Sequence, residues 1–484
     1  MREPVTTFHE GVFNGRRLRY AATVREAAVP REGGEPGAYV VSTQYVAAGQ
    51  GDPADRPVIF ACNGGPIVAA TPLHMGGLGP RRIAYPDDLA ADPSGFPIVD
   101  NEYCLLDVAD LVFFDPAGTG FSRVAEGVDP ATYYDVDADA RQMATWIEGW
   151  LRDHDRSASP VYLVGESYGS IRVAVVSELL TALAEPVRVE GVVLVSQATN
   201  IIETCWRPAN ILSYAVSLPT LTAIAWYHGK IDRAGRTLDD VITESSHFAD
   251  TEYLSGLFQG DDLPAGERGR LAERLASLTG IPASRWTERN LRLSKHDFRA
   301  ELLAAEGLVL YMYDGRYAGP PAVPEPAGEG SFSAHVGGPV NPTGVSAIVD
   351  ALEPAIATHL KDFLEAARPG DYRGMEPPVD AEGRAPADVW RWGATSPFGD
   401  WPYMDSIARA MTRAPAMRLL ICTGLYDLTT TIGAARHAVR QSAWPRERVR
   451  TAAYAGGHMM YSVEASLREL SGDLRDFVKS TPVT

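Results

Sequence analysis

Four continuous apolar runs constrain the fold of this chain more than any other feature. They span 58–62 (VIFAC), 111–115 (LVFFD), 161–164 (VYLV) and 192–195 (VVLV), and each ends at Gly, Asp, Ser or Asn. A strand that is apolar on both faces needs cover on both, as in a parallel sheet flanked by helices. Helix-like stretches such as 133–154 and 168–184 lie between the runs. This alternation predicts an α/β fold.

A long segment, 199–403, interrupts that rhythm with helix-like stretches rich in aromatic residues and a Pro/Gly-rich loop at 319–344. After it the pattern resumes, with strands predicted at 419–422 and 449–454 and helices around 434–441 and 462–479. Alternating segments at 18–24 and 38–46 predict antiparallel strands at the sheet edge. We therefore expect a core made of 1–198 and 404–484, with 199–403 inserted as a helical lid.

Charge and cysteine content narrow the class of partner. The 484 residues carry a net charge of -18, which disfavours nucleic acid and anionic membranes and favours a peptide or small-molecule substrate. Residues 1–19 contain no apolar run of signal-peptide length, and nowhere in the sequence do about 18 consecutive apolar residues occur, so we expect neither export nor a membrane span. Four cysteines without a C-x-x-C pair indicate reduced thiols and a cytoplasmic location, with Cys62 and Cys422 expected in the core. The histidines lack metal-binding spacing, so we expect no metal or cofactor, and the oligomeric state stays open.

A candidate nucleophile follows the third apolar run. Residues 165–169 read Gly-Glu-Ser-Tyr-Gly, directly after 161–164 and at the start of a predicted helix. That placement is typical of the G-x-S-x-G turn, which raises a serine hydroxyl above the sheet of an α/β-hydrolase. The pattern alone is common, and an ordinary strand-to-helix turn is the alternative. Its context predicts an α/β-hydrolase fold with Ser167 as nucleophile.

The two partners of such a serine should follow later strands, the acid before the histidine. Asp427 comes after strand 419–422, and His458 comes after strand 449–454. His458 would then accept the Ser167 proton, and Asp427 would orient the imidazole and stabilise its cation. His437 is a rival base, but it lies inside the predicted helix 434–441.

Two further motifs predict substrate contacts. Asn63-Gly-Gly-Pro66 follows the first apolar run, and glycines there allow an amide to point at a developing oxyanion, so we expect this loop to supply a second donor beside the Tyr168 amide. A plain tight turn is the alternative for this motif. Glu166, beside the nucleophile, must be buried or protonated to avoid opposing that anion. A protonated Glu166 next to Asn63 would bind a substrate carboxylate, whereas a purely structural Glu166 would cap an amide.

These motifs together resemble the serine carboxypeptidases of the peptidase S10 family, particularly its bacterial branch. The similarity extends to Leu78-Gly-Pro80, to 115–122 (DPAGTGFS), to 226–230 (WYHGK), to Tyr426-Asp-Leu428 and to 457–461 (GHMMY). The resemblance implies release of a C-terminal residue through an acyl-enzyme, favoured at acidic pH and without a metal. It supports Ser167, Asp427 and His458 as the triad, Gly65 and Tyr168 as amide donors, and Asn63 and Glu166 as carboxylate binders.

Three departures from the family pattern leave the reaction open. Ile67 and Val68 stand where the family has small residues, which predicts a narrowed or reshaped pocket. Gly77 replaces a second glutamate that eukaryotic members carry, and Thr429–Thr431 replace a proline-containing turn. An esterase, amidase or acyltransferase on the same scaffold is therefore the alternative to a carboxypeptidase. A hydrolase-shaped binding protein without turnover is a third reading, which the intact triad disfavours.

Overall fold

One large mixed sheet runs through the protein. The computed structural model describes residues 1–31, 34–86, 96–233, 235–322, 341–342, 347–366, 372–374, 384, 386–393 and 401–480. The sheet has the strand order β1-β2-β3-β7-β4-β9-β10-β15-β16, with β8 paired to β3. The six neighbouring strands β7, β4, β9, β10, β15 and β16 are mutually parallel, and β1 to β3 extend the sheet as an antiparallel edge. The predicted α/β-hydrolase fold with a mostly parallel sheet is confirmed.

The strands predicted from the apolar runs and the alternating segments are all present, whereas β1, β5, β6, β8 and β11 to β14 were not predicted. The edge strand β1 is exposed on alternate residues and was not predicted. The smaller pairs are β5 with β6, β11 with β12, and β13 with β14. The bounds are β1 Val5–Phe13, β2 Arg16–Pro30, β3 Pro36–Ala47, β4 Val58–Cys62, β5 Arg81–Ile83, β6 Ile98–Asp100, β7 Asp110–Phe114, β8 Arg123–Val124, β9 Val161–Glu166, β10 Val189–Val195, β11 Val309–Leu310, β12 Ala318–Gly319, β13 Pro321–Ala322, β14 Asn341–Pro342, β15 Arg418–Gly424 and β16 Val449–Tyr454.

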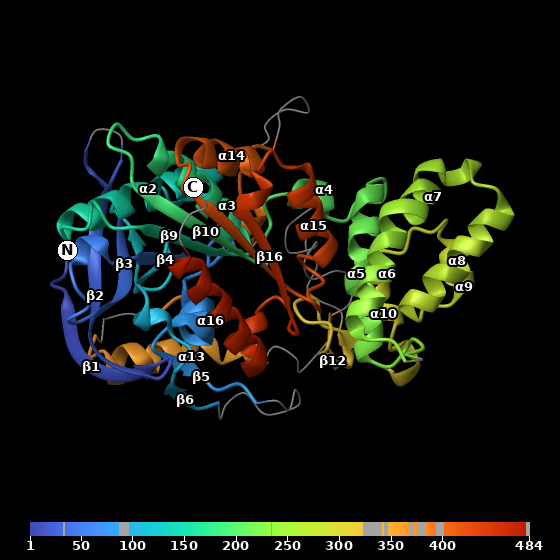
Figure 1. The fold of residues 1–484 in the computed structure, drawn as a ribbon, viewed down its shortest axis with the longest axis horizontal. Coiled ribbons are helices and arrows are strands. Elements are labelled where there is room, and N and C mark those ends of the chain that lie inside the picture. The colour runs from blue at the N-terminus through green and yellow to red at the C-terminus, as the bar shows by residue number, and fades with distance from the viewer. Residues whose placement is uncertain are drawn as a thin grey trace.

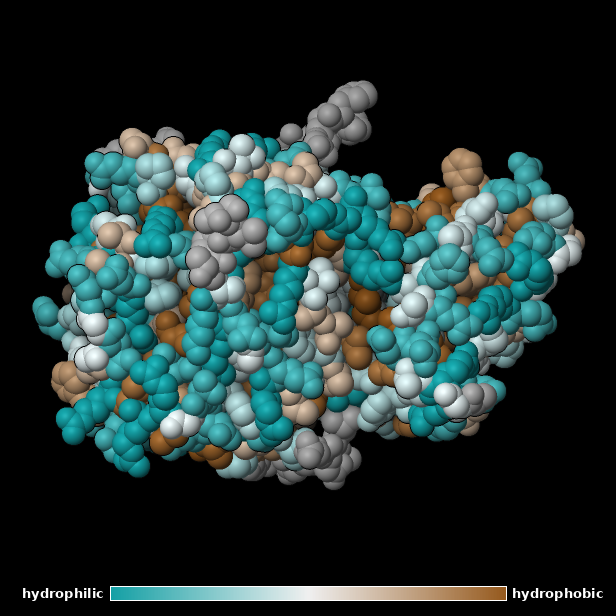
Figure 2. Space-filling view, viewed as in Figure 1, coloured by the Kyte–Doolittle hydropathy of each residue, from teal (hydrophilic) through white to brown (hydrophobic). Residues whose placement is uncertain are grey.

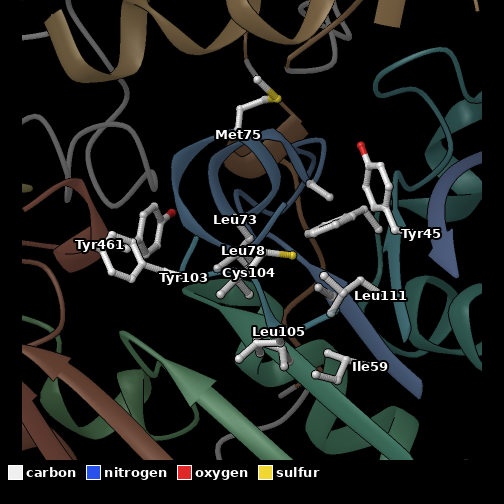
Figure 3. Packing of buried hydrophobic residues seen from close by; sticks show 14 of the residues in the cluster. Tyr45, Ile59, Leu73, Met75, Leu78, Tyr103, Cys104, Leu105, Leu111 and Tyr461 are labelled. Carbon is white, nitrogen blue, oxygen red and sulfur yellow. The ribbon is translucent and has the colours of Figure 1, made fainter. Parts of the chain in front are cut away.

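Helices cover both faces of this sheet because successive strand residues point to opposite sides. Phe60, Leu163 and Ile421 face one hydrophobic cluster, which the helices α2 and α3 complete together with α14 and α15. Ala61, Val164 and Cys422 face the other cluster, which α13 and α16 complete (Figures 1 and 3). These helices span α2 Val136–Asp153, α3 Tyr168–Thr181, α13 Leu352–Thr358, α14 Tyr403–Arg413, α15 Ile432–Gln441 and α16 Glu464–Lys479.

The inserted segment divides into two parts with different packing. Its first part, 211–301, forms a helical arm at one end of the molecule, with a hydrophobic cluster of its own (Figure 1). Its later part, 347–364, carries α12 and α13 and packs into the cluster beneath the sheet. Most of the predicted loop 319–344 lies outside the described residues. The remaining helices are α1 Thr71–Leu73, α4 Ile201–Thr204, α5 Ile211–Tyr227, α6 Leu238–Phe248, α7 Leu254–Gln259, α8 Ala265–Thr279, α9 Ala283–Glu288, α10 Lys295–Glu301 and α12 Ala347–Asp350.

The surface, the cysteines and the described helices bear on the predicted class of protein. The face in Figure 2 is mainly hydrophilic, with hydrophobic residues gathered where the helical arm meets the body. All four cysteines are free, and Cys62 and Cys422 are buried, as predicted. No helix among the described residues combines the length and apolar content needed to cross a membrane. The same residues contain no group of three or more His, Cys, Asp or Glu side chains placed to hold a metal ion.

Candidate active site

Ser167 occupies a sharp turn between β9 and α3. Its backbone has φ 58° and ψ -126°, a conformation that non-glycine residues rarely adopt. Its amide donates to the Val195 carbonyl oxygen at 2.9 Å, and its own carbonyl accepts from the Ser170 hydroxyl at 2.6 Å. These bonds hold the turn in a conformation that presents the side chain at the carboxyl ends of the parallel strands, as the motif predicted.

The two glycines of this motif are required by close packing. A Cβ at Gly165 would lie 2.1 Å from the carbonyl oxygen of Gly169. A Cβ at Gly169 would lie 2.9 Å from the carbonyl oxygens of Cys62 and Asn63. Because glycine has no side chain, helix α3 can begin directly against the end of β4, and no other residue would fit at these two positions.

His458 and Asp427 lie side by side at the ends of the last two strands. His458 Nδ1 is 2.7 Å from Asp427 Oδ2, and both side chains are buried. Burial by itself would lower the pKa of His458, but the negative charge of Asp427 and its hydrogen bond, with a contribution from Glu166, raise that pKa above its usual value. His458 and Ser167 line the same cavity, so the three predicted triad residues meet at one place.

The turn after Asp427 supplies three hydrogen bonds to its carboxylate. The amides of Thr429 and Thr430 donate to Oδ1 at 2.7 and 3.0 Å, and the Thr430 hydroxyl donates to Oδ2 at 2.5 Å. Proline, which the family pattern places in this turn, has no N–H to donate. The threonine run therefore holds the Asp427 carboxylate in a fixed orientation toward His458.

The rival histidine lies elsewhere. His437 is on α15, where its Nε2 is 3.2 Å from Glu203 Oε2. It is not among the residues that line the cavity containing Ser167 and His458. The prediction that His437 packs on its helix rather than serving as the base agrees with this position.

The loop after β4 lies against the nucleophile turn. A Cβ at Gly64 would be only 2.5 Å from the Tyr168 amide nitrogen, and Gly65 has φ +104°. Gly65 and Tyr168 both line the cavity beside Ser167, as expected of two amide donors. The loop is held from below by Arg172, a fully buried side chain that donates to the Asn63 carbonyl oxygen at 2.5 Å.

Arg172 is itself neutralised by Asp139, whose Oδ2 accepts from Arg172 Nε at 2.7 Å and from the Tyr168 hydroxyl at 2.9 Å. Such a pair needs both partners, because an unpaired buried charge is costly. It ties α2 and α3 to the loop after β4. Nothing local in the sequence indicates that this arginine supports the loop.

The two β-branched residues of this loop point in different directions. Ile67 is buried and packs in the hydrophobic cluster of α2 and α3, away from the cavity. Val68 lines the cavity, and its Cγ2 lies close to Gly65. The expected change in the cleft beside the loop therefore involves Val68 and not Ile67.

Glu166 is buried next to Asn63 and Tyr461. Its Oε2 accepts from the Tyr461 hydroxyl at 2.5 Å, and Asn63 also hydrogen-bonds its side chain. Burial raises the pKa of Glu166 to about 7, although the positive His458 and these two donors oppose the increase. At neutral pH this carboxyl group is therefore partly protonated, as the carboxylate-binding hypothesis requires.

All predicted site residues except Asp427, which lies behind His458, line one cavity of about 1270 Å³. Loops after β4, β9, β10, β15 and β16 form its floor, at the carboxyl ends of the strands where open α/β sheets bind ligands. Its remaining walls come from residues 311–317, 348–357, 372–374 and Trp392, all within the predicted insertion. Aromatic residues are prominent in these walls: Tyr311, Tyr313, Tyr317, Tyr372 and Trp392.

Comparisons with known proteins agree with this geometry. The family model described as serine carboxypeptidase, Peptidase_S10, matches residues 44–234. No curated protein matches the chain. The structure is similar to Kex1Δp, a prohormone-processing carboxypeptidase from Saccharomyces cerevisiae, with 12% identity and a TM-score of 0.58 over 95% of this chain and 91% of the other.

Other solved structures align less well. A highly thermostable carboxyl esterase from Bacillus coagulans has 12% identity and a TM-score of 0.38, covering 95% of this chain and 99% of the other. A haloalkane dehalogenase loop variant from Bradyrhizobium elkanii has 10% identity and a TM-score of 0.34, with 98% of each chain covered. At such identities the structural similarity shows the fold alone. This protein is therefore an α/β-hydrolase-fold chain whose residues 44–234 match the serine carboxypeptidase family.

Proposed function

We propose that this protein is a serine carboxypeptidase that removes a C-terminal residue from peptides or peptide-like substrates. Ser167 is the nucleophile, His458 the general base and acid, and Asp427 the residue that orients His458. The amides of Gly65 and Tyr168 stabilise the oxyanion. Asn63 and Glu166 bind the carboxylate of the substrate's last residue.

The reaction proceeds in two halves that share the same groups. Ser167 Oγ attacks the carbonyl carbon of the last peptide bond, and its proton passes to His458. The tetrahedral intermediate collapses when His458 gives that proton to the leaving nitrogen, which releases the C-terminal amino acid. Water then attacks the acyl-enzyme with His458 as base, and the shortened peptide leaves with Ser167 restored.

The observation that carries this proposal is the position of Glu166 and Asn63. Both line the cavity of Ser167 and His458, on the side where the loop after β4 meets the nucleophile turn. Burial raises the pKa of Glu166 to about 7, so it can donate a hydrogen bond to a carboxylate instead of repelling it. A site that holds a terminal carboxylate beside the nucleophile favours cleavage of the last bond.

The pH dependence follows from two groups with opposite requirements. His458 must be neutral to accept a proton, and its pKa is raised, so activity falls as the solution becomes acidic. Glu166 must be protonated to bind a carboxylate, and its pKa is about 7, so binding falls as the pH rises through 7. For a free-acid substrate, kcat/KM plotted against pH should therefore be bell-shaped. For the corresponding C-terminal amide, which has no carboxylate for Glu166 to bind, the fall at high pH should be absent.

The test compares a blocked dipeptide that has a free C-terminus with its C-terminal amide. We expect kcat/KM for the free acid to exceed that of the amide by about tenfold or more at pH 6, and to lose this advantage above pH 8. Glu166→Gln should remove the alkaline fall because glutamine does not titrate. Equal rates on the two substrates at every pH would rule out the carboxypeptidase.

An esterase, amidase or acyltransferase is the second candidate, and the cavity favours it. A volume of about 1270 Å³ with Tyr311, Tyr313 and Trp392 in its walls suits a bulky aromatic substrate that need not be a peptide. Aryl esters with and without a carboxylate separate the two proposals. If the carboxylate gives no advantage but the ester is hydrolysed, the esterase is favoured. Fluorophosphonate labelling of Ser167 distinguishes either enzyme from a binding protein without turnover.

A further inference from the structure

Tyr461 is a buried residue of the site that the triad chemistry does not use. It lies in the 3-10 turn Met460–Ser462, three residues after His458. Its side chain is only 1% exposed, and its hydroxyl donates to Glu166 Oε2 at 2.5 Å. Figure 3 shows the ring at the border of the hydrophobic cluster. Almost all of this side chain is packed in apolar surroundings, and its one polar atom meets Glu166.

The space for this ring is created by two adjacent glycines. Gly76 and Gly77 lie in the π-helical turn His74–Leu78. A Cβ at Gly76 would lie 2.5 Å from Tyr461 Cε2, and a Cβ at Gly77 would lie 3.0 Å from Tyr461 Cβ. A side chain at either position would meet the ring. The Tyr461 ring therefore occupies space that a glutamate side chain at position 77 would need.

Asn63 links to the same two groups, and its orientation is determined by the backbone. The Leu73 amide donates to Asn63 Oδ1 at 3.0 Å, which directs the Asn63 amide group toward the other side. That NH₂ group can only donate. It hydrogen-bonds both Glu166 and Tyr461. The three side chains form a small network in which Asn63 donates to both Glu166 and Tyr461, and Tyr461 donates to Glu166 Oε2.

The donors in this network leave one carboxyl position open. A phenol hydroxyl has one hydrogen to donate, and Tyr461 donates it to Glu166 Oε2. When Glu166 carries a proton on Oε1, neither Tyr461 nor the Asn63 NH₂ group needs it, since both are already donating. The proton can then point into the cavity that Glu166 lines. A carboxylate on a ligand is the acceptor that suits such a neutral acid.

We infer that Tyr461 is a positioning residue for substrate specificity, whose hydroxyl holds Glu166 so that its acid proton faces the terminal carboxylate of the substrate. This inference rests on the proposed carboxypeptidase function and names the device by which the site recognises that carboxylate. A phenol replaces a second carboxyl group here and adds no further charge.

Other titratable groups also face Glu166 and enter its pH dependence. The positive form of His458 favours the ionised carboxylate, whereas Asp427 opposes it. The Tyr85 hydroxyl is close enough to feel the charge of Glu166. The Tyr461 hydrogen bond lowers the pKa of Glu166, so its loss should raise that pKa. The alkaline fall in carboxylate binding should then move to higher pH.

The experiment measures kcat and KM of Tyr461→Phe against pH, with the blocked free-acid dipeptide and its amide as substrates. Because Glu166 loses the hydrogen bond from Tyr461 in this variant and is held less firmly, we expect KM for the free acid to rise about tenfold, with kcat changed less than about threefold. The alkaline limb should move up by about half a pH unit or more. The preference for free acid over amide should fall in proportion to the KM change.

A matched control is Tyr103→Phe. Tyr103 belongs to the same hydrophobic cluster (Figure 3), and its hydroxyl also donates to a carboxylate, but to that of Glu464, at 3.0 Å, and not to Glu166. We expect it to retain the wild-type KM ratio and alkaline limb. A second variant, Gly76→Ala, keeps the hydroxyl but displaces the ring, and it should reproduce the KM and pH effects if Tyr461→Phe fails to fold.

The outcomes separate this inference from the proposed function. A wild-type enzyme that never distinguishes free acid from amide overturns both. A wild type that does distinguish them, with Tyr461→Phe or Gly76→Ala keeping the same KM ratio and alkaline limb, overturns the role of Tyr461 alone. A loss of thermal stability without a shift of the limb would show that Tyr461 is purely structural, and would also overturn it.

Discussion

The sheet core and the helical arm contribute to the candidate site in different ways. The core places Ser167 and the loop after β4 through contacts within the sheet and its two covering helices, α2 and α3. The arm, 211–301, has its own hydrophobic cluster and contains none of the predicted site residues. Residues next to Asp427 contact both regions.

The turn that carries Asp427 is anchored on the arm side. Its neighbours Tyr426 and Leu428 are buried in the arm's hydrophobic cluster, although β15 belongs to the sheet. The Leu428 amide donates to the Met312 carbonyl oxygen at 3.2 Å, and Lys295 of α10 donates to the Thr429 carbonyl oxygen at 3.2 Å. The segment predicted as an insertion thus holds the proposed acid of the triad and also forms part of the cavity wall.

His458 is tied to the same segment. Its amide donates to the Tyr313 carbonyl oxygen at 2.6 Å, and the two rings are 5.2 Å apart. The nucleophile depends on packing inside the core, whereas the acid and the base depend on contacts between the core and the insertion. This difference predicts that perturbing the arm changes catalysis through Asp427 and His458 rather than through Ser167.

The largest effect should come from the base itself. We expect His458→Ala to lower kcat by at least about a thousandfold, because it removes the imidazole proposed to accept the Ser167 proton. The matched control is His437→Ala, which removes the rival histidine from α15 and should keep activity within about twofold. A severe loss in His437→Ala with a mild one in His458→Ala would contradict the assignment. Steady-state kinetics on an activated ester measures both.

A smaller effect should distinguish the two hydrophobic clusters. Leu428 and Leu470 are both fully buried, in the arm cluster and beneath the sheet respectively. Truncation of either to alanine should lower the free energy of unfolding by about 2 to 5 kcal/mol. Because Leu428 adjoins Asp427, only Leu428→Ala should also lower kcat of the folded enzyme, by about tenfold.

Urea unfolding and active-site titration with a fluorophosphonate check this pair. Titration counts folded, reactive enzyme, so kcat can be referred to that fraction. Equal kcat values for the two variants would show that the arm contacts are irrelevant to the triad, and the comparison of the two regions would fail.

The smallest effect concerns a charge that the arm places behind the triad. Burial lowers the pKa of Lys295 to about 8, so it is cationic at neutral pH, and it lies close enough to Asp427 for their charges to interact. A positive charge there disfavours protonation of His458. Lys295→Met should therefore raise the pKa of His458 and move the acid limb of the kcat/KM profile to higher pH, by less than about one unit.

The exposed Lys479 at the end of α16 offers a control for net charge. Lys479→Met should leave the acid limb in place. A shift to lower pH in Lys295→Met would reverse the sign expected from the electrostatics and refute the interaction.

Much of the core was predictable because its strands are apolar on both faces and end at polar residues. Strands β4 and β16 begin and end at the predicted residues. Ser167, Asp427 and His458 follow their strands in the expected order. The edge strand β1 was missed because its residues alternate between partial exposure and full exposure, with little apolar signal. The division of the insertion into an arm and a part beneath the sheet left no local pattern either.

The sequence by itself determined the sheet, the nucleophile turn and the order of the candidate catalytic residues, since each depends on residues close together in the chain. Only the tertiary structure decided which side chains support them. Arg172 beneath the oxyanion loop, Thr430 on Asp427 and Tyr461 on Glu166 all take their roles from hydrogen bonds to groups buried with them. Arg172 and Tyr461 reach partners about a hundred to three hundred residues away. Periodicity and motif spacing carry no record of such partners, because burial and contact arise only when the layers pack.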